Sequence, residues 1–381
     1  MTETVNLMTD LLAFEIAGKP LDSGLEVSDD DFKILYKMSR AHDVAHLVGD
    51  ALIKNDLISG EYKDKFSKCV IAAVFRYEKQ RYEYERIKKA LAESKIKFMP
   101  LKGSVIRNMY PEPWMRTSCD IDILVEKGSL DAAKKAVKAI GFEYKGMGSH
   151  DISLFSNSGV HLELHYSLIE DEVVSESDKV LKDAWDSAEN CSQFEYRMTD
   201  DMFYFYHIAH MAKHFLIGGC GVRPFIDIYI LKNVCSQNKK GREELLKKGG
   251  LLEFSQGAEQ LTDVWFCGKT PTKLTDSMCS FIIRGGVYGN FENNVAVRQN
   301  KQGGKLKYML YKVFLPYNDI KLYFPVLEKH KVLLPLCEIV RWFRLIFKGG
   351  MSRSVKQINI NNSMDEAVAS EAEYLITELK L

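Results

Sequence analysis

Closely spaced cysteines, long apolar runs and a net charge are all missing from this sequence. Its eight cysteines are scattered over 381 residues and form no C-x-x-C pair, which argues against a disulfide scaffold or a structural zinc site. No window approaches the roughly 20 apolar residues that a membrane-spanning helix needs. The amino-terminal segment lacks a basic stretch followed by an apolar run, so no signal peptide is expected. These absences predict a cytoplasmic protein with free thiols.

The charges balance, because Lys+Arg and Asp+Glu both number 52. No overall field therefore draws the chain to nucleic acid or to anionic lipid, and DNA binding is not expected. Any polyanion must be met by a local patch. Hydrophobic residues make up 46% of the chain and charged residues 27%, which is ordinary for a globular protein of two or three domains.

Helical patterns at both ends of the chain enclose a mixed segment. Apolar residues at helical spacing predict an N-terminal helical region, 1–94. Strand and helix patterns then alternate over 95–195, which predicts a compact α+β core. The helical period returns over 196–350, where the Gly- and Asn-containing stretch 284–305 is expected to be a long loop. A polar tail, 351–381, ends the chain.

Within the core, "IKFMP" predicts a short strand whose Pro100 suits a sheet edge. Ser129 is expected to cap the helix "DAAKKAVKAI", which ends at Gly141. The segments "DISLF" and "VHLELHYSL" flank a turn-rich linker and predict a β-hairpin. In the tail, Ser363 and Glu366 have the spacing of a capping box that starts a last helix.

Two aspartates interrupt the apolar strand "CDIDILV". Side chains alternate along a strand, so Asp120 and Asp122 share one face while Ile121 and Ile123 line the other. Two carboxylates held side by side repel each other, and a cation between them removes that repulsion. Mg²⁺ suits such a pair because it takes carboxylate oxygens and keeps its other positions for water and phosphate. The bland alternative is a solvated edge strand whose charges discourage aggregation.

Two further features favour the metal interpretation. The turn "LKGS" lies between a strand and a short helix, where Gly103 allows a close backbone approach and a helix start attracts phosphate. In "HLELHY", Glu163 falls on the polar side of its strand together with His161 and His165. Such a carboxylate is expected to complete a two-metal site or to act as a general base, unless it forms a structural pair with Arg116 or a histidine.

Gly-Ser followed by Asp-x-Asp and a later strand carboxylate resembles the DNA polymerase β-like nucleotidyltransferase superfamily. The string "LKGSVIRNMYPEPWMRTSCDIDILV", with "HLELHYSL" after it, is more closely similar to a bacterial branch of uncharacterised nucleotidyltransferases. "K-G-S" with "R-x-S-x-D-I-D" is also similar to the nucleotidyltransferase toxins of abortive-infection systems. The close resemblance covers roughly residues 95–170, and a weaker one continues through "HIAHMAKH" and "GVRPFIDIYIL".

The resemblance implies a polymerase β-like nucleotidyltransferase core flanked by helical regions. It implies Asp120, Asp122 and Glu163 as the catalytic carboxylates and the ligands of Mg²⁺, with two ions expected. It also implies that Gly103 and Ser104 hold the triphosphate, with Lys102 and Arg116 as cations that bind phosphate or position the site. One departure is the gap between the Gly-Ser turn and the Asp-x-Asp strand, which is longer than usual and must be accommodated by "YPEPWM". Lys102 and Arg116 have the alternative job of neutralising the carboxylates.

A histidine face is the next candidate feature. His207, His210 and His214 fall at i, i+3 and i+7 of a predicted helix, but the acidic residue that a zinc hydrolase requires is missing from the motif. We interpret them as hydrogen-bonded core residues that border the nucleotide cleft. Arg223 and Asp227, four residues apart, are expected to form an ion pair within one helix or between helices, and a role in the cleft is the less favoured alternative.

The aromatic and basic segment "RWFRLIF", which begins at Arg341, has two interpretations. It has the composition of a helix that lies on a membrane surface. We favour packing of its apolar face against the domain core, so membrane association is not expected.

The sequence thus predicts an Mg²⁺-dependent nucleotidyltransferase that moves a nucleoside monophosphate from a nucleoside triphosphate to a hydroxyl of an unknown acceptor, be it a small molecule, saccharide, RNA or protein. Two alternatives are a toxin-like enzyme that modifies RNA or protein and a catalytically silent nucleotide-binding protein. The intact carboxylate set argues against the silent protein, and the neutral net charge does not favour an RNA groove.

Overall fold

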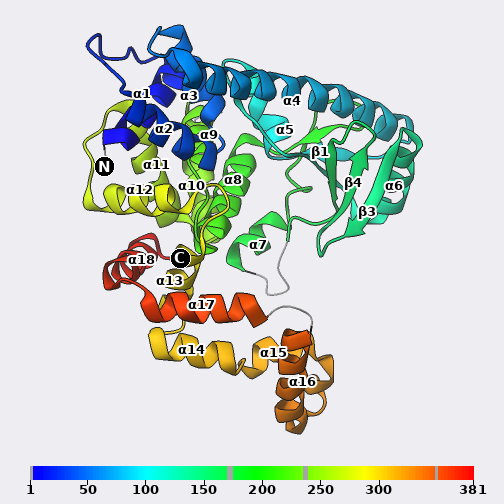
Figure 1. The fold of residues 1–381 in the computed structure, drawn as a ribbon. Helices are drawn as coiled ribbons and strands as arrows, with labels where there is room; N and C mark the ends of the chain where they lie inside the picture. The colour runs from blue at the N-terminus through cyan, green and yellow to red at the C-terminus, as the bar shows by residue number, and fades with distance from the viewer. Residues whose placement is uncertain (1–2, 170–174, 235–238, 348–350) are drawn as a thin grey trace.

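The computed structural model describes residues 3–169, 175–234, 239–347 and 351–381. Cys235 lies outside the described residues, and the other seven cysteines are free thiols. Within the described ranges, no helix combines the length and the apolar character that a membrane crossing requires. The described residues have an α+β architecture in which helices flank a five-stranded mixed sheet (Figure 1).

Four helices open the chain. They are α1 (Glu3–Ala17), α2 (Asp29–Ala41), α3 (Ala45–Lys54) and α4 (Gly60–Glu93). Helix α2 begins at a capping box, in which Ser28 accepts a hydrogen bond from the backbone N–H of Asp31 and the Asp31 carboxylate accepts one from Ser28, so two N–H groups at the helix start are satisfied. The 34 residues of α4 run along the top of the molecule in Figure 1 and reach from the other N-terminal helices to the sheet.

The sheet has five strands in the order β1-β2-β5-β4-β3. They are β1 (Phe98–Pro100), β2 (Asp120–Val125), β3 (Phe142–Met147), β4 (Asp151–Ser156) and β5 (His161–His165). Strands β2 and β5 are parallel, whereas the other neighbours are antiparallel. The edge position of β1 accommodates Pro100, and β4 and β5 form the predicted hairpin.

Smaller elements connect these strands. They are α5 (Gly103–Ile106), α6 (Leu130–Ala139), α7 (Glu176–Leu181) and a second, two-stranded sheet of β6 (Glu189–Asn190) and β7 (Tyr196–Arg197), together with short 3₁₀ turns at Arg107–Met109, Pro113–Met115 and Lys127–Ser129. Ser129 directly precedes α6 but makes no side-chain capping bond. Its predicted capping role is therefore wrong, although the helix itself is present.

Helices α4 and α6 cover one face of the sheet. Ile87 of α4 and Val137 of α6 belong to one buried cluster with Ile121, Ile123 and Leu162 of the strands. The predicted alternation of side chains in β2 is confirmed, because Ile121 and Ile123 are both buried in this apolar layer. Asp120 and Asp122 must then point to the opposite face of the sheet.

The described residues from 200 onward are mostly helical. Their helices are α8 (Asp200–Leu216), α9 (Arg223–Val234), α10 (Lys239–Lys248), α11 (Leu252–Cys267), α12 (Lys273–Gly285), α13 (Phe291–Lys301), α14 (Lys305–Val313), α15 (Tyr317–Tyr323), α16 (Leu334–Phe347), α17 (Met351–Ser363) and α18 (Glu366–Leu379), with 3₁₀ turns at Pro325–Glu328 and Lys331–Leu333. Helices α8, α9, α11 and α12 share a large apolar cluster with α1, α2 and α3. The two helical regions therefore pack into one core.

Three local expectations need correction. The stretch 284–305 is not one long loop, because α13 occupies its centre and the Asn290 side chain caps the start of that helix. The last helix begins with Asp365 as its cap, and Ser363 instead ends α17. Strand β3 was not predicted, because apolar and polar residues alternate only from Phe142 to Lys145 and most of its side chains are exposed.

The close contact between α3 and α4 generates a stability prediction. A Cβ atom at Gly49 would lie 2.7 Å from the Cβ of the fully buried Phe66. We expect Gly49→Val to lower the free energy of unfolding by about 1 to 3 kcal/mol, because the two helices must move apart. Urea unfolding of Gly128→Val, whose Cβ would meet nothing within 4 Å, supplies the control. Equal effects of the two substitutions would show that α3 and α4 are not tightly packed.

Candidate active site

The pairing of β2 with β5 sets three carboxylates side by side. In this parallel pair Asp122 is opposite Glu163, and Asp120 is opposite His161. Paired residues of adjacent strands project from the same face of a sheet. Asp120, Asp122 and Glu163 therefore share the face that α4 and α6 leave free, with His161 and His165 alongside.

Asp122 is the most buried of the three carboxylates, with 2% of its surface exposed. Its Oδ1 atom lies 3.0 Å from Lys102 Nζ and 2.9 Å from His165 Nε2. Burial alone would raise the pKa of Asp122, but the charges of Lys102 and His165 hold it well below its usual range. The same contact acts on the histidine: burial favours its neutral form, yet hydrogen bonds to Asp122 and Glu163 raise the pKa of His165 to about 9.

Asp120 has the opposite electrostatic environment. Burial, followed by the nearby charges of Asp122 and Glu163, raises the pKa of Asp120 to about 6. Repulsion from Asp122 and Glu163 thus adds to the cost of burying the charge of Asp120. A bound cation would relieve that repulsion.

Overlapping groups of side chains here have the spacing of metal ligands. Ligand atoms of Asp120, His161 and Glu163 lie within 4.8 Å of one another, and so do those of Asp122, Glu163 and His165. The two groups share Glu163. A third such group is formed by His150 and Asp151, at the start of β4, and by His165 at the end of β5. The sequence placed His161 and His165 beside Glu163 but gave them no role, although their alternation with leucines put them on the same face.

The "KGS" turn begins where β1 ends. Lys102 has a positive φ of 44°, which is uncommon for a residue with a side chain, and it directs its amine to Asp122. A Cβ at Gly103 would lie 3.1 Å from the Cβ of Ser118, so the glycine has a packing reason to be small. The N–H of Ser104 donates to Leu101 O at 3.0 Å. The structure thus brings Lys102 and Gly103 close to the aspartates. The backbone N–H of Ser104 is instead engaged by the carbonyl oxygen of Leu101.

Arg116 is held by a buried ion pair. Its Nε and Nη2 atoms donate to the two carboxylate oxygens of Asp227 at 2.7 and 2.8 Å, and Tyr110 adds a hydrogen bond of 2.6 Å. Arg223 pairs instead with Asp43 at 2.8 Å. The predicted pair of Arg223 with Asp227 is therefore wrong, because the cation that reaches Asp227 comes from the loop before β2.

A second buried cation fixes the loop that precedes β2. Arg107 donates to Gly103 O at 2.8 Å, to Gln80 Oε1 at 3.0 Å and to Ser118 Oγ at 2.5 Å. Burial, and then the nearby charge of Arg116, lowers the pKa of Arg107 to about 10. This network connects α4, the "KGS" turn and the start of β2, and it therefore positions the aspartates.

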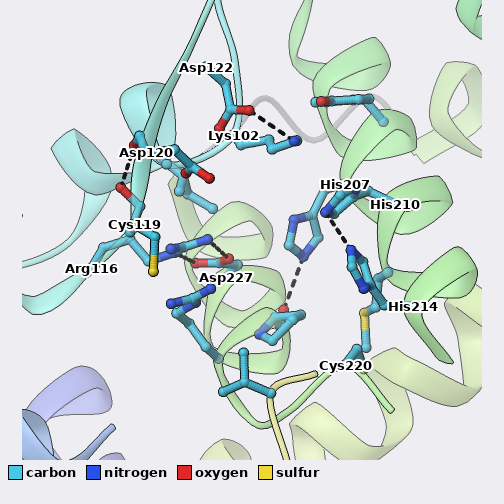
Figure 2. Close-up of a pocket in the computed structure, with 18 of the residues that line it drawn as sticks. Lys102, Arg116, Cys119, Asp120, Asp122, His207, His210, His214, Cys220 and Asp227 are labelled. Carbon is cyan, nitrogen blue, oxygen red and sulfur yellow. Dashed lines mark hydrogen bonds and ion pairs between the residues drawn. The ribbon is translucent and has the colours of Figure 1, made fainter. Parts of the chain in front are cut away.

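A cavity of about 250 Å³ separates the sheet from α8 and α9. Figure 2 shows Asp120, Asp122 and Lys102 on one side and His207, His210 and His214 on the other. The predicted histidine face therefore borders the cleft. His207 Nε2 lies 3.1 Å from Pro224 O, and the Nε2 atoms of His210 and His214 lie 3.1 Å apart.

The cavity also has walls that the sequence did not reveal. Tyr206, Cys220 and Tyr288 contribute to its lining. Arg223 and Asp227, for which the cleft was the less favoured alternative, also line it. Tyr288 comes from the connection between α12 and α13, which had been assigned to a loop without a role. Only the helical period of α8 could have drawn attention to Tyr206, since it lies four residues before His210 and therefore on the same side of the helix. Glu163 is not among the lining residues and lies behind the aspartates, along β5.

A family model described as "uncharacterised nucleotidyltransferase" matches residues 28–266. The matched span contains the five-stranded sheet, α8 and α9, and thus both walls of the cavity except the segment around Tyr288. A search of curated proteins returned no match.

The Arg116 ion pair generates a prediction about stability. Asp227→Asn leaves Arg116 buried without a counter-charge, so we expect the free energy of unfolding to fall by about 3 to 5 kcal/mol. The exposed pair Arg81–Glu78, with a 2.6 Å contact, provides the matched control, and Glu78→Gln should cost less than about 1 kcal/mol.

Urea unfolding as a function of pH sharpens this test. Arg116 outweighs the effect of burial and lowers the pKa of Asp227 in the folded state. The stabilisation is therefore present above about pH 4, the unfolded pKa, and is lost as the pH falls through the lower folded value. The difference between the wild type and Asp227→Asn should shrink accordingly in acid. A difference that grew in acid would contradict an ionised Asp227.

Proposed function

Because this chain belongs to the uncharacterised nucleotidyltransferase family, we propose that it transfers a nucleoside monophosphate from a nucleoside triphosphate to a hydroxyl group of an acceptor. The observation that carries this proposal is the register of β2 and β5, which groups Asp120, Asp122 and Glu163 beside a cavity. Family membership alone supports the coarser statement that the protein is a nucleotidyltransferase.

The donor atoms of this group suit Mg²⁺. Three carboxylates supply the hard oxygen ligands that this ion prefers. Lys102 and His165 both contact Oδ1 of Asp122, so Oδ2 is left for a metal. Glu163 has ligand atoms close to those of Asp120 in one group and to those of Asp122 in the other, which supports the proposal of two ions, with His165 as a hydrogen-bond donor to Asp122 and not as a ligand. Asp120 and Asp122 would hold them together with Glu163, and bound Mg²⁺ would offset the negative charge of the triphosphate and of the oxygens that attack and leave.

The chain's own residues would align the reactants. The acceptor oxygen forms a bond to the α-phosphorus, the bond from that phosphorus to the bridging oxygen breaks, and pyrophosphate leaves. Glu163, whose side chain is about a quarter exposed, is the proposed base for the hydroxyl proton if it is not a metal ligand. Lys102 is the proposed triphosphate contact of the "KGS" turn. Arg116 is proposed to position the loop before β2, since Asp227 occupies its guanidinium.

The histidine wall is the proposed acceptor side of the cavity. His207, His210 and His214 face the aspartates across the cavity (Figure 2). Imidazole nitrogens both donate and accept hydrogen bonds, so they suit an acceptor that carries hydroxyl groups. The alternative of a nucleotide-binding protein without chemistry shares the same cavity but gains nothing from a third carboxylate.

Label transfer tests the proposed reaction. The purified chain, incubated with Mg²⁺, each α-labelled nucleoside triphosphate and a cell extract, should release pyrophosphate and label an acceptor.

We expect Asp120→Asn to abolish the labelling, because a metal ligand and its charge are lost. Its metal-free stability should not fall, since the substitution removes repulsion from Asp122 and Glu163. Asp64→Asn, on the exposed side of α4, is the control and should behave as wild type. Full labelling by Asp120→Asn would refute the metal-binding role.

Glu163 separates chemistry from binding. We expect Glu163→Gln to bind the triphosphate with Mg²⁺ nearly as well as wild type but to turn over about 10²- to 10⁴-fold more slowly, as loss of a general base typically does. Calorimetric titration and initial rates measure the two effects. Glu143→Gln, which removes an exposed carboxylate of β3 that pairs with Lys145, should change neither. An unchanged rate in Glu163→Gln would make Glu163 structural and Asp151 the next candidate.

A further inference from the structure

Helix α16 presents an apolar stripe to solvent. The exposed side chains are Leu336, Ile339, Val340, Phe343, Ile346 and Phe347. Their spacing of i, i+3, i+4, i+7, i+10 and i+11 places them along one side of the helix. Phe343 is 56% exposed and Phe347 is 79% exposed. The expectation that this face of "RWFRLIF" packs against the domain core is therefore wrong.

The opposite side of α16 is firmly held. Cys337 is buried in a small cluster with Ile320 and Leu327. Glu338, also buried, accepts hydrogen bonds of 2.7 Å from the backbone N–H of Leu315 and from Arg341 Nε. The orientation of the helix is thus fixed by its own contacts, and the stripe faces outward as a consequence.

The stripe lies in a strongly basic part of the chain. We call residues 305–347, which contain α14, α15 and α16, the basic lobe. Its sequence has eight lysines and arginines against three acidic residues, although the whole chain has no net charge. Figure 1 shows the basic lobe at the bottom of the molecule, at the opposite end from α4. It also lies beyond the span that the family model matches.

We propose that the basic lobe binds an anionic lipid surface, with the α16 stripe inserted at the level of the headgroups. Apolar side chains on one side of a helix and clustered cations around it are the two components of such binding. Leu336, Ile339 and Ile346 would gain little from a nucleic-acid backbone, which rewards cations and stacking aromatics. A second copy of the chain would bring a second positive lobe against the first. The lipid surface is the partner that satisfies both the apolar and the charged groups.

Vesicle flotation with the full chain tests this proposal. Wild-type protein should float with vesicles of phosphatidylcholine and phosphatidylglycerol, should float much less with phosphatidylcholine alone, and should be released by added salt. We expect the double variant Ile339→Ser/Phe343→Ser to bind the anionic vesicles at least about tenfold more weakly than wild type, because two apolar side chains would be lost from the interface.

A matched control comes from α4. Ile71 and Phe75 have the same residue types and the same i, i+4 spacing, and each is 68% exposed. Ile71→Ser/Phe75→Ser should float as wild type. The proposal is overturned if wild type does not bind anionic vesicles, or if both double variants lose binding equally. It is also overturned if Ile339→Ser/Phe343→Ser instead abolishes self-association in sedimentation or binding to a labelled RNA. None of these readouts depends on nucleotidyl transfer.

Discussion

Burying Asp122 beside two other carboxylates is the electrostatic constraint on which the site depends. Lys102 and His165 meet the charge of Asp122 at a single oxygen, so the carboxylate stays ionised without losing its second oxygen. Lys102 reaches this position from a backbone with positive φ, which is a conformation that a neighbouring structure must hold in place. The "KGS" turn, the pair of strands β2 and β5, and His165 therefore form one unit, because Lys102 and His165 both contact Asp122.

A second constraint ties the sheet to the helices. The cavity lies between β2 on one side and α8 and α9 on the other, and two rigid bodies that merely touch would leave its width undefined. Arg116, in the loop before β2, donates two hydrogen bonds to the carboxylate of Asp227 in α9. A bidentate pair fixes orientation as well as distance. Of the two roles considered for Arg116, phosphate binding and positioning, this pair therefore favours positioning of the two cavity walls.

The sequence predicted those features that depend on local periodicity. The alternation around Asp122 and Glu163 was sufficient to predict two strands and the shared side of their carboxylates, and the structure has both. The partner of Arg116 was not predictable, because the pair joins residues 111 positions apart and the nearer Arg223 satisfied the same pattern. Helix α13 was missed since its Gly- and Asn-rich flanks hide a helix whose signal is the Asn290 cap.

Composition misled for a different reason. A net charge of zero hides an uneven distribution, because the basic lobe has five more basic than acidic residues and the rest of the chain has five more acidic than basic ones. The amphipathic pattern of α16 was read correctly as a helix with one apolar side, but periodicity does not state what covers that side. The small cluster around Cys337 shows that a helix can be anchored through its other side. Because that cluster is separate from the two larger apolar clusters, we expect substitutions in the stripe to leave the cavity intact, so that lipid binding and nucleotidyl transfer can be tested independently.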